Sequence, residues 1–191
     1  MLDFNLPTSG FAQPLVILQA CHERLRRMVE LLIPLREHLR EHGADGPAKV
    51  TASTIRQYFE NLWPLHEQDE ELEILPRVRA RLRSRNTVAA QHLVETIATV
   101  HEQHGSFEPL RRSVMAMLLA IETGAAQRLD DPAVQAFVEL FRLHIALEED
   151  VLEPAYARLL TPEDLQQIGC AMAARRGLPW PEAAPGAGAP R

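Results

Sequence analysis

Apolar residues recur every three to four positions along four long segments of this chain, and helix-breaking residues separate the segments. The segments cover about residues 11–42, 50–85, 87–123 and 132–160. This spacing is the period of an α-helix that buries one face. Only 5% of the chain is aromatic, which favours helices over β-sheets. Four helices joined by short links predict an all-α fold, an up-down-up-down four-helix bundle.

The two ends of the chain differ from the periodic segments. We expect an N-terminal extension over residues 1–11 and the bundle over residues 12–160. Thr161 provides a helix N-cap and a proline follows it, so a short fifth helix is expected over residues 161–176. Residues 177–191 are rich in proline, glycine and alanine, which predicts a disordered tail.

Prolines lie inside the predicted bundle helices, among them Pro34, Pro64 and Pro109. Proline has no backbone N–H, and its ring crowds the preceding helical turn. We therefore expect each proline to kink its helix without changing the topology of the bundle.

The charge and the cysteine content exclude several classes of function. The formal net charge is −6, which argues against nucleic acid as a partner. The cationic run at 77–85 is interpreted as a solvated helix end. Cys21 and Cys170 form no CxxC pair, and the N-terminus has neither a basic start nor a long apolar run. We expect a cytoplasmic protein with no nucleic-acid or membrane partner.

Every apolar stripe contains a histidine where a core residue is expected, and two stripes also contain a glutamate one turn later. The six residues are His22, His66, Glu70, His104, His144 and Glu148. A lone histidine on an apolar face is usually an ordinary core residue, but four can converge at one level of an antiparallel bundle. A buried carboxylate must be paired, protonated or bound to a metal. Because no lysine or arginine lies on the stripes near that level, metal coordination is the economical explanation.

The two histidine–glutamate pairs belong to matching motifs. HEQDEELEILP (66–76) and HIALEEDVLEP (144–154) both start with His, carry Glu-Glu at the fifth and sixth positions, and end in Pro. In each motif the histidine and the first glutamate lie on one helix face, about 6 Å apart along the axis. A helix with a histidine on its stripe precedes each motif. The chain is interpreted as a helix pair used twice, with an approximate two-fold axis through the site.

Four imidazoles and two carboxylates, with no thiolate, suit iron or manganese, and zinc is an alternative. Six ligands are too many for one tetrahedral zinc but suit two metal ions. In the simplest arrangement each ion takes two histidines, Glu70 and Glu148 bridge the ions, and an oxo or hydroxo group adds a further bridge. At least one ion then keeps an open position for O₂, NO, peroxide or water.

These motifs resemble the hemerythrin-like (HHE cation-binding) domain family over about residues 12–160. The resemblance implies a four-helix bundle with a non-haem di-iron centre. The ligands it implies are His22, His66, Glu70, His104, His144 and Glu148. Oxygen-carrying hemerythrins take two histidines at HxxxH spacing from the third helix. This chain has HEQH there, so His101 lies three residues before His104 and is only a candidate fifth histidine ligand.

The other acidic residues of the two motifs are expected to face solvent. They include Glu67, Asp69, Glu71 and Glu149. A carboxylate that accepts a hydrogen bond from a ligating histidine would also be compatible with the pattern. Cys21 lies off the stripe and is interpreted as packing, not as a redox thiol.

Three kinds of function remain open. We favour a metal-binding protein that binds or senses O₂, NO or iron, because no further acid, base or substrate pocket is recognisable in the sequence. The second is a di-iron redox enzyme acting on peroxide, NO or Fe²⁺, or repairing iron centres, although the cysteine-bearing N-terminal segment of the family's repair proteins has no match here. The third is a metal-free helical interaction module. The expected partner is a diatomic ligand, and a homodimer is possible.

Overall fold

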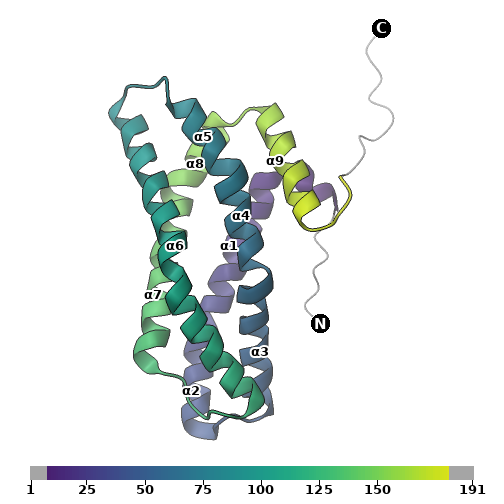
Figure 1. Cartoon of the computed structure of the whole chain (residues 1–191), viewed down its shortest axis with the longest axis vertical. Helices are drawn as coiled ribbons and strands as arrows, with labels where there is room; N and C mark the ends of the chain where they lie inside the picture. The colour runs from purple at the N-terminus through teal and green to yellow at the C-terminus, as the bar shows by residue number, and fades with distance from the viewer. Residues whose placement is uncertain (1–7, 181–191) are drawn as a thin grey trace.

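The computed structural model describes residues 8–180, which form helices and no β-strand (Figure 1). Four long bundle helices run alternately up and down, as expected, and a short fifth helix packs on their side. Bundle helix one comprises α1 (Pro14–Glu30) and α2 (Leu32–His42). Bundle helix two comprises α3 (Gly46–Asn61), α4 (Trp63–Asp69), η2 (Glu70–Ile74) and α5 (Leu75–Leu82). Bundle helix three is α6 (Val88–Thr123).

Bundle helix four comprises α7 (Asp131–Leu147), η3 (Glu148–Leu152) and α8 (Glu153–Leu159). The fifth helix is α9 (Pro162–Arg175), and a 3-10 turn, η1 (Thr8–Ala12), precedes α1. None of the described helices combines the length and the apolarity needed to cross a lipid bilayer.

Side-chain caps define where several of these helices begin. Asp45, Thr87 and Asp130 each accept a hydrogen bond from the backbone N–H three residues later, at the starts of α3, α6 and α7. At the start of α9, Thr161 and Asp164 form a capping box. Each such cap stabilises its helix by about 1 kcal/mol, so the boundaries between the bundle helices are encoded locally.

The bundle helices are interrupted close to two of these three prolines, Pro34 and Pro64. Helix α1 ends just before Leu31, three residues ahead of Pro34, and α3 ends just before Leu62, two residues ahead of Pro64. The missing N–H of each proline leaves a carbonyl of the preceding turn without its helical partner. Helix α6, by contrast, continues through Pro109 as one helix of 36 residues, so Pro109 does not end its helix and the kink expected there stays a prediction.

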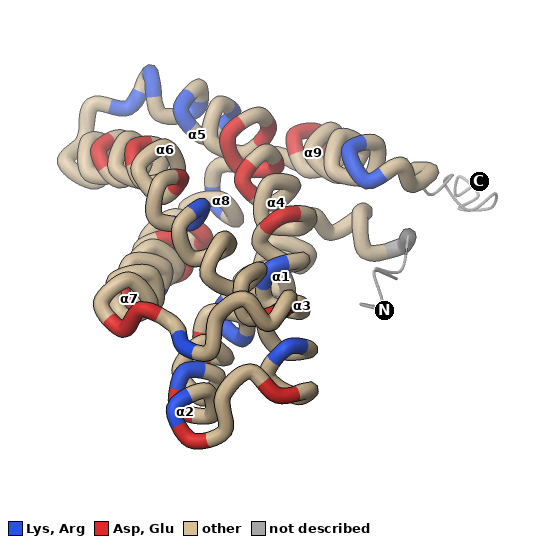
Figure 2. The backbone as a smooth tube through the Cα atoms, turned by 60° about the horizontal axis from the view of Figure 1, so that its bottom comes forward, with Lys and Arg blue, Asp and Glu red and all other residues tan. Residues whose placement is uncertain are grey.

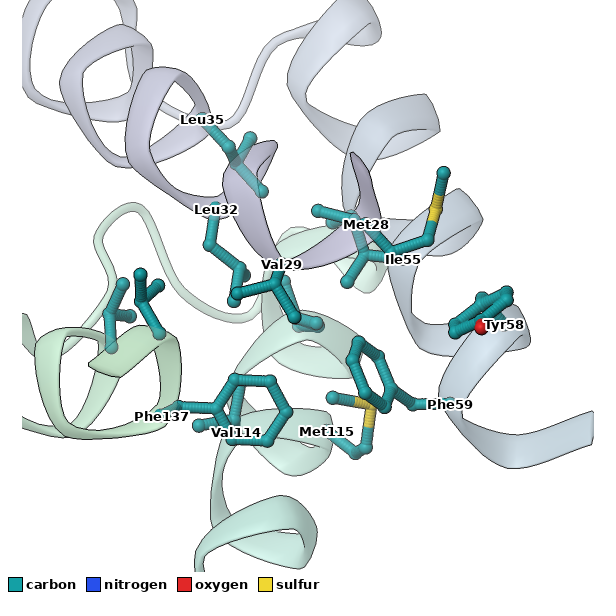
Figure 3. Packing of buried hydrophobic residues seen from close by; sticks show 14 of the residues in the cluster. Met28, Val29, Leu32, Leu35, Ile55, Tyr58, Phe59, Val114, Met115 and Phe137 are labelled. Atoms are coloured by element: carbon teal, nitrogen blue, oxygen red, sulfur yellow. The ribbon is translucent and has the colours of Figure 1, made fainter. Parts of the chain in front are cut away.

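The apolar core consists of two clusters, one above and one below the middle of the bundle in the view of Figure 1. The lower cluster fills the half that contains α2, α3 and most of α7, and Figure 3 shows part of it. Its buried members include Leu32, Ile55, Phe59, Val114, Phe137 and Phe141. The upper cluster joins α5, α8, α9 and η1. Its buried members include Phe11, Ile74, Val78, Val100, Leu152 and Tyr156.

Both ends of the described chain pack onto the upper cluster. Phe11, which we place at the start of the first helical segment, lies instead in η1, where it is fully buried. Leu178 and Trp180 pack against the same cluster, so the first part of the expected disordered tail is in contact with the bundle. Residues 1–7 and 181–191 lie outside the described residues, and the disorder expected for 181–191 therefore stays a prediction.

Helix α9 is joined to bundle helix two by buried ion pairs around Asp69. Arg176 Nη2 donates to Asp69 Oδ2 at 2.6 Å, and Arg175 also donates to Asp69. Arg175 Nη2 donates to Glu73 Oε1 at 3.1 Å. In Figure 2 the acidic stretch between α4 and α5 lies beside α9. The expectation that Asp69 faces solvent is wrong, because α9 covers it and leaves it 1% exposed.

Removing the Asp69 carboxylate should destabilise the fold. We expect Asp69→Ala to lower the free energy of unfolding by about 3 kcal/mol, because two largely buried guanidinium groups lose their shared partner. The exposed pair of Glu30 and Arg142 provides the control, and Glu30→Ala should cost less than about 1 kcal/mol. Urea denaturation of both variants measures the difference, and similar losses in the two would contradict the role given to Asp69.

Candidate metal centre

All six ligands proposed from the sequence come together midway along the bundle. Each of the four bundle helices supplies one histidine, and bundle helices two and four each add a glutamate from the start of η2 or η3. The exposed fractions are 0% for His22, 1% for His66, 0% for Glu70, 5% for His104, 0% for His144 and 0% for Glu148. The six polar side chains therefore share one interior, water-poor level.

The imidazole Nε2 atoms face the two carboxylates at short range. For Glu148, the distances are 3.2 Å from His144 Nε2 to Oε1 and 3.2 Å from His22 Nε2 to Oε2. For Glu70, both His66 Nε2 and His104 Nε2 lie 3.5 Å from Oε2. Each glutamate thus faces the histidine of its own helix and one from another bundle helix.

The donor atoms form two groups that share both glutamates. One group is His22, His66, Glu70 and Glu148, and the other is Glu70, His104, His144 and Glu148. Within each group, the donor atoms all lie within 4.8 Å of one another. Two sets of donors with two common carboxylates are the geometry in which a carboxylate bridges neighbouring cations.

The missing hydrogen bonds of these donor atoms indicate a site for a cation and not a set of side chains that satisfy one another. Among the described residues, neither the four Nε2 atoms nor the four carboxylate oxygens have a hydrogen-bond partner, although some pairs are only 3.2 Å apart. Buried polar groups in folded proteins are nearly always satisfied, and an unsatisfied buried carboxylate is costly. A metal ion satisfies nitrogen and oxygen donors together, so the donor set fits a metal site.

The protonation of the two glutamates differs in the metal-free cluster. Burial, reinforced by the nearby Glu148 charge, raises the pKa of Glu70 well above its usual range. Burial also acts to raise the pKa of Glu148, but His144 and His22 outweigh it and hold that pKa below its usual range. One glutamate therefore stays protonated beside an ionised one, as expected for two carboxylates that share a site.

The pKa values of the histidines also differ from one another. Burial lowers the pKa of His144 to about 4 and holds the pKa of His66 well below its usual range. Burial also opposes protonation of His22, but the nearby carboxylates of Glu148 and Glu153 raise its pKa to about 9. Neutral imidazole is the form that binds metal, and a bound cation would displace the proton from His22.

Both glutamates stand at the start of π-helical turns. The N–H of Leu75 donates to the carbonyl of Glu70, and the N–H of Glu153 donates to the carbonyl of Glu148, five residues back in each case. Turns of this kind are frequent at functional sites. If both motifs are taken as regular α-helix, these π turns are not predicted. The signal in the sequence is the proline that ends each motif, because proline cannot donate the next helical hydrogen bond.

The outward nitrogens of three of the four histidines lie close to a carboxylate or amide oxygen. His104 Nδ1 lies 2.7 Å from Glu71 Oε1, and His144 Nδ1 lies 2.9 Å from Gln103 Oε1. His22 Nδ1 lies 2.9 Å from an oxygen of Glu153. Such contacts fix the orientation of each ring and direct Nε2 inward.

The contacts of Gln103 and Glu153 were not predicted from the sequence. Glu71 is half-buried and does not face solvent as we first expect; its contact with His104 is the alternative that the sequence leaves open for these acidic residues. Glu149 stays at the surface, where it pairs with Arg26.

His101, the candidate fifth histidine, lies outside both donor groups. Its side chain is 60% exposed, and its Nδ1 lies 2.8 Å from Glu71 Oε2. Glu71 thus contacts both His101 and His104, but only His104 directs a nitrogen toward the carboxylates. The geometry places His101 at the surface end of a hydrogen-bonded chain.

Aromatic rings close the lower side of the centre. The ring of Trp63 lies 5.3 Å from that of His66 and 5.8 Å from those of His104 and His144, between centroids. The ring of Phe107 lies 5.0 Å from that of His144. These contacts hold the imidazoles in place and lower the local dielectric, which strengthens electrostatic interactions inside the site.

The two histidines that contact Glu71 allow a matched test. His104→Ala should lower the metal content of the purified protein, because it removes an inward donor. His101→Ala should leave the metal content unchanged, because its ring points to solvent. Elemental analysis of both variants and of the wild type measures this. A loss of metal in His101→Ala would show that the centre rearranges to use five histidines.

Comparison with known proteins agrees with this geometry. The family model of the hemerythrin HHE cation binding domain matches residues 13–156, a range that contains all six donors. The chain is also similar to an uncharacterised protein of Haemophilus influenzae, with 27% identity over 164 residues that cover 86% of this chain and 90% of that protein. The chain therefore belongs to the hemerythrin HHE cation-binding domain family.

Proposed function

We propose that the chain holds two non-haem iron ions and uses them to bind or sense a small diatomic molecule, O₂ or NO. The observation that carries the proposal is the pair of donor groups that share both glutamates. His22 and His66 would hold one ion and His104 and His144 the other, while the two glutamates would bridge the ions.

The donor chemistry supports iron as the metal. Each group offers two imidazole nitrogens and carboxylate oxygens, without sulfur, and histidine–carboxylate sets with open positions are typical of non-haem iron. Manganese accepts similar donors, and zinc would be satisfied by four donors in a tetrahedral site. Bound iron would supply an open position for a small molecule and a change of oxidation state.

The surroundings support binding of a small molecule over chemistry on a large substrate. The centre lies between two apolar clusters, and its six donors are at most 5% exposed. On bundle helix three, for example, His104 lies between Val100 of the upper cluster and Phe107 of the lower one. This position suits a ligand of two atoms, whose entry requires little rearrangement of the core. The chain's residues hold the metals, orient the imidazoles and exclude water.

Metal analysis tests the first part of the proposal. Protein produced with ample iron and purified without a polyhistidine tag should contain about two irons per chain. Glu70→Ala and Glu148→Ala should each lower the occupancy of both positions, because each glutamate belongs to both donor groups. One iron per chain in the wild type would contradict the shared arrangement, and no metal would favour an interaction module.

Gas binding tests the second part. The iron-loaded, anaerobically reduced protein should change its absorption spectrum on exposure to O₂ or NO, and the change should reverse when the gas is removed. Stopped-flow spectroscopy measures both directions. Irreversible oxidation without a reversible phase would exclude a carrier, and sustained turnover of added peroxide, NO or Fe²⁺ would identify a redox enzyme instead.

A further inference from the structure

Tyr156 has a buried hydroxyl group that the fold does not satisfy. The residue lies in α8 and is 0% exposed. Its hydroxyl has no hydrogen-bond partner within the part of the chain that the structure describes. Buried tyrosine hydroxyls normally find a partner, because leaving one unpaired is costly. The hydroxyl therefore indicates that an acceptor from outside the protein belongs beside it.

The helix geometry places Tyr156 on the same face as Glu148. The two residues are eight positions apart, and the π turn η3 lies between them. Two turns of α-helix take about seven residues, and a π turn takes about one more. Eight residues thus amount to about two complete turns, so Tyr156 follows Glu148 along the face that carries the metal donors.

The environment keeps the hydroxyl protonated. Burial, followed by the nearby charges of Glu70 and Glu148, raises the pKa of Tyr156 well above its usual value. A neutral phenol beside carboxylates can donate a hydrogen bond. With the four oxygens of Glu70 and Glu148 occupied by metal ions, a ligand bound at the centre would offer this hydroxyl an acceptor.

The matching position of the other motif has no such group. Tyr156 is the twelfth residue after His144, and the twelfth residue after His66 is Val78, which is also fully buried. Both belong to the upper cluster, where the segments α5 and α8 are in contact. The approximate two-fold symmetry of the candidate ligands is therefore broken at this position, where Tyr156 offers a hydroxyl and Val78 does not.

We propose that the Tyr156 hydroxyl donates a hydrogen bond to the small ligand bound at the metal centre and so makes one side of the centre the binding side. The inference rests on the proposed two-iron function and deepens it. Tyr156 is a positioning residue in this proposal, not a metal ligand, and it favours ligands that carry negative charge once bound. An anion of two or three atoms fits this chemistry.

Azide binding to the oxidised, iron-loaded full chain tests the inference. The variant Tyr156→Phe removes only the hydroxyl. Tyr58→Phe is the matched control, because Tyr58 is 2% exposed and its hydroxyl donates to the backbone oxygen of Cys21, at 3.4 Å. Iron content is measured for each protein, and azide affinity is measured by absorbance titration.

We expect Tyr156→Phe to keep its iron and to bind azide about tenfold more weakly, as is typical for loss of a hydrogen bond to a charged group. Tyr58→Phe should match the wild type in both measurements. The infrared stretch of bound azide should shift in D₂O in the wild type and in Tyr58→Phe but not in Tyr156→Phe, which a purely structural effect would not produce.

Three outcomes would overturn the inference. Equal azide affinity in the wild type and Tyr156→Phe would show that the hydroxyl does not contact the ligand. Loss of iron in Tyr156→Phe would show that Tyr156 ligates the metal. If the wild type held no iron, the proposed function itself would fail, whereas the first two outcomes leave that function intact.

Discussion

Two carboxylates buried at mid-bundle are the constraint on which the rest of this structure depends. Glu70 and Glu148 are fully buried, and the four inward imidazoles are the polar groups that face them. Moving such groups out of water costs several kcal/mol each unless they are paired or bound to a cation. A core that places both at one level is suited to a metal site, and the apolar clusters above and below it supply the stability that these polar groups do not.

Helix α9, which lies outside the four bundle helices, supports one of the two glutamate-bearing turns, η2. Asp69 immediately precedes Glu70, and α9 holds it through Arg175 and Arg176. The same Arg175 reaches Glu73 inside η2. A π turn has a less regular hydrogen-bond pattern than an α-helix, so contacts on its outer side help to keep its carboxylate in place. Helix α9 is thus linked to the centre through the turn that carries one of its ligands.

The sequence predicted the bundle, the fifth helix and the convergence of all six donors, because these depend on helical periodicity and on the improbability of buried glutamate. It did not predict contacts made between helices. Asp69 looks like a solvated acid until α9 is placed over it, and Gln103 looks like an ordinary surface residue until the ring of His144 is oriented. The π turns do not follow from a 3.6-residue period, and the proline that ends each motif is the feature of the sequence that indicates them.

The two halves of the centre match at the ligands and differ around them. His104 is held by Glu71, but its counterpart His22 is approached most closely by Glu153, because Glu149 pairs with Arg26 instead. Donor identity decides which metal binds, whereas the groups around the donors decide what each ion does. Two ions with the same donors would therefore differ in charge balance and in the groups that face them. A duplicated motif can produce a symmetric metal site, and substitutions outside the ligand positions then make its two sides unequal.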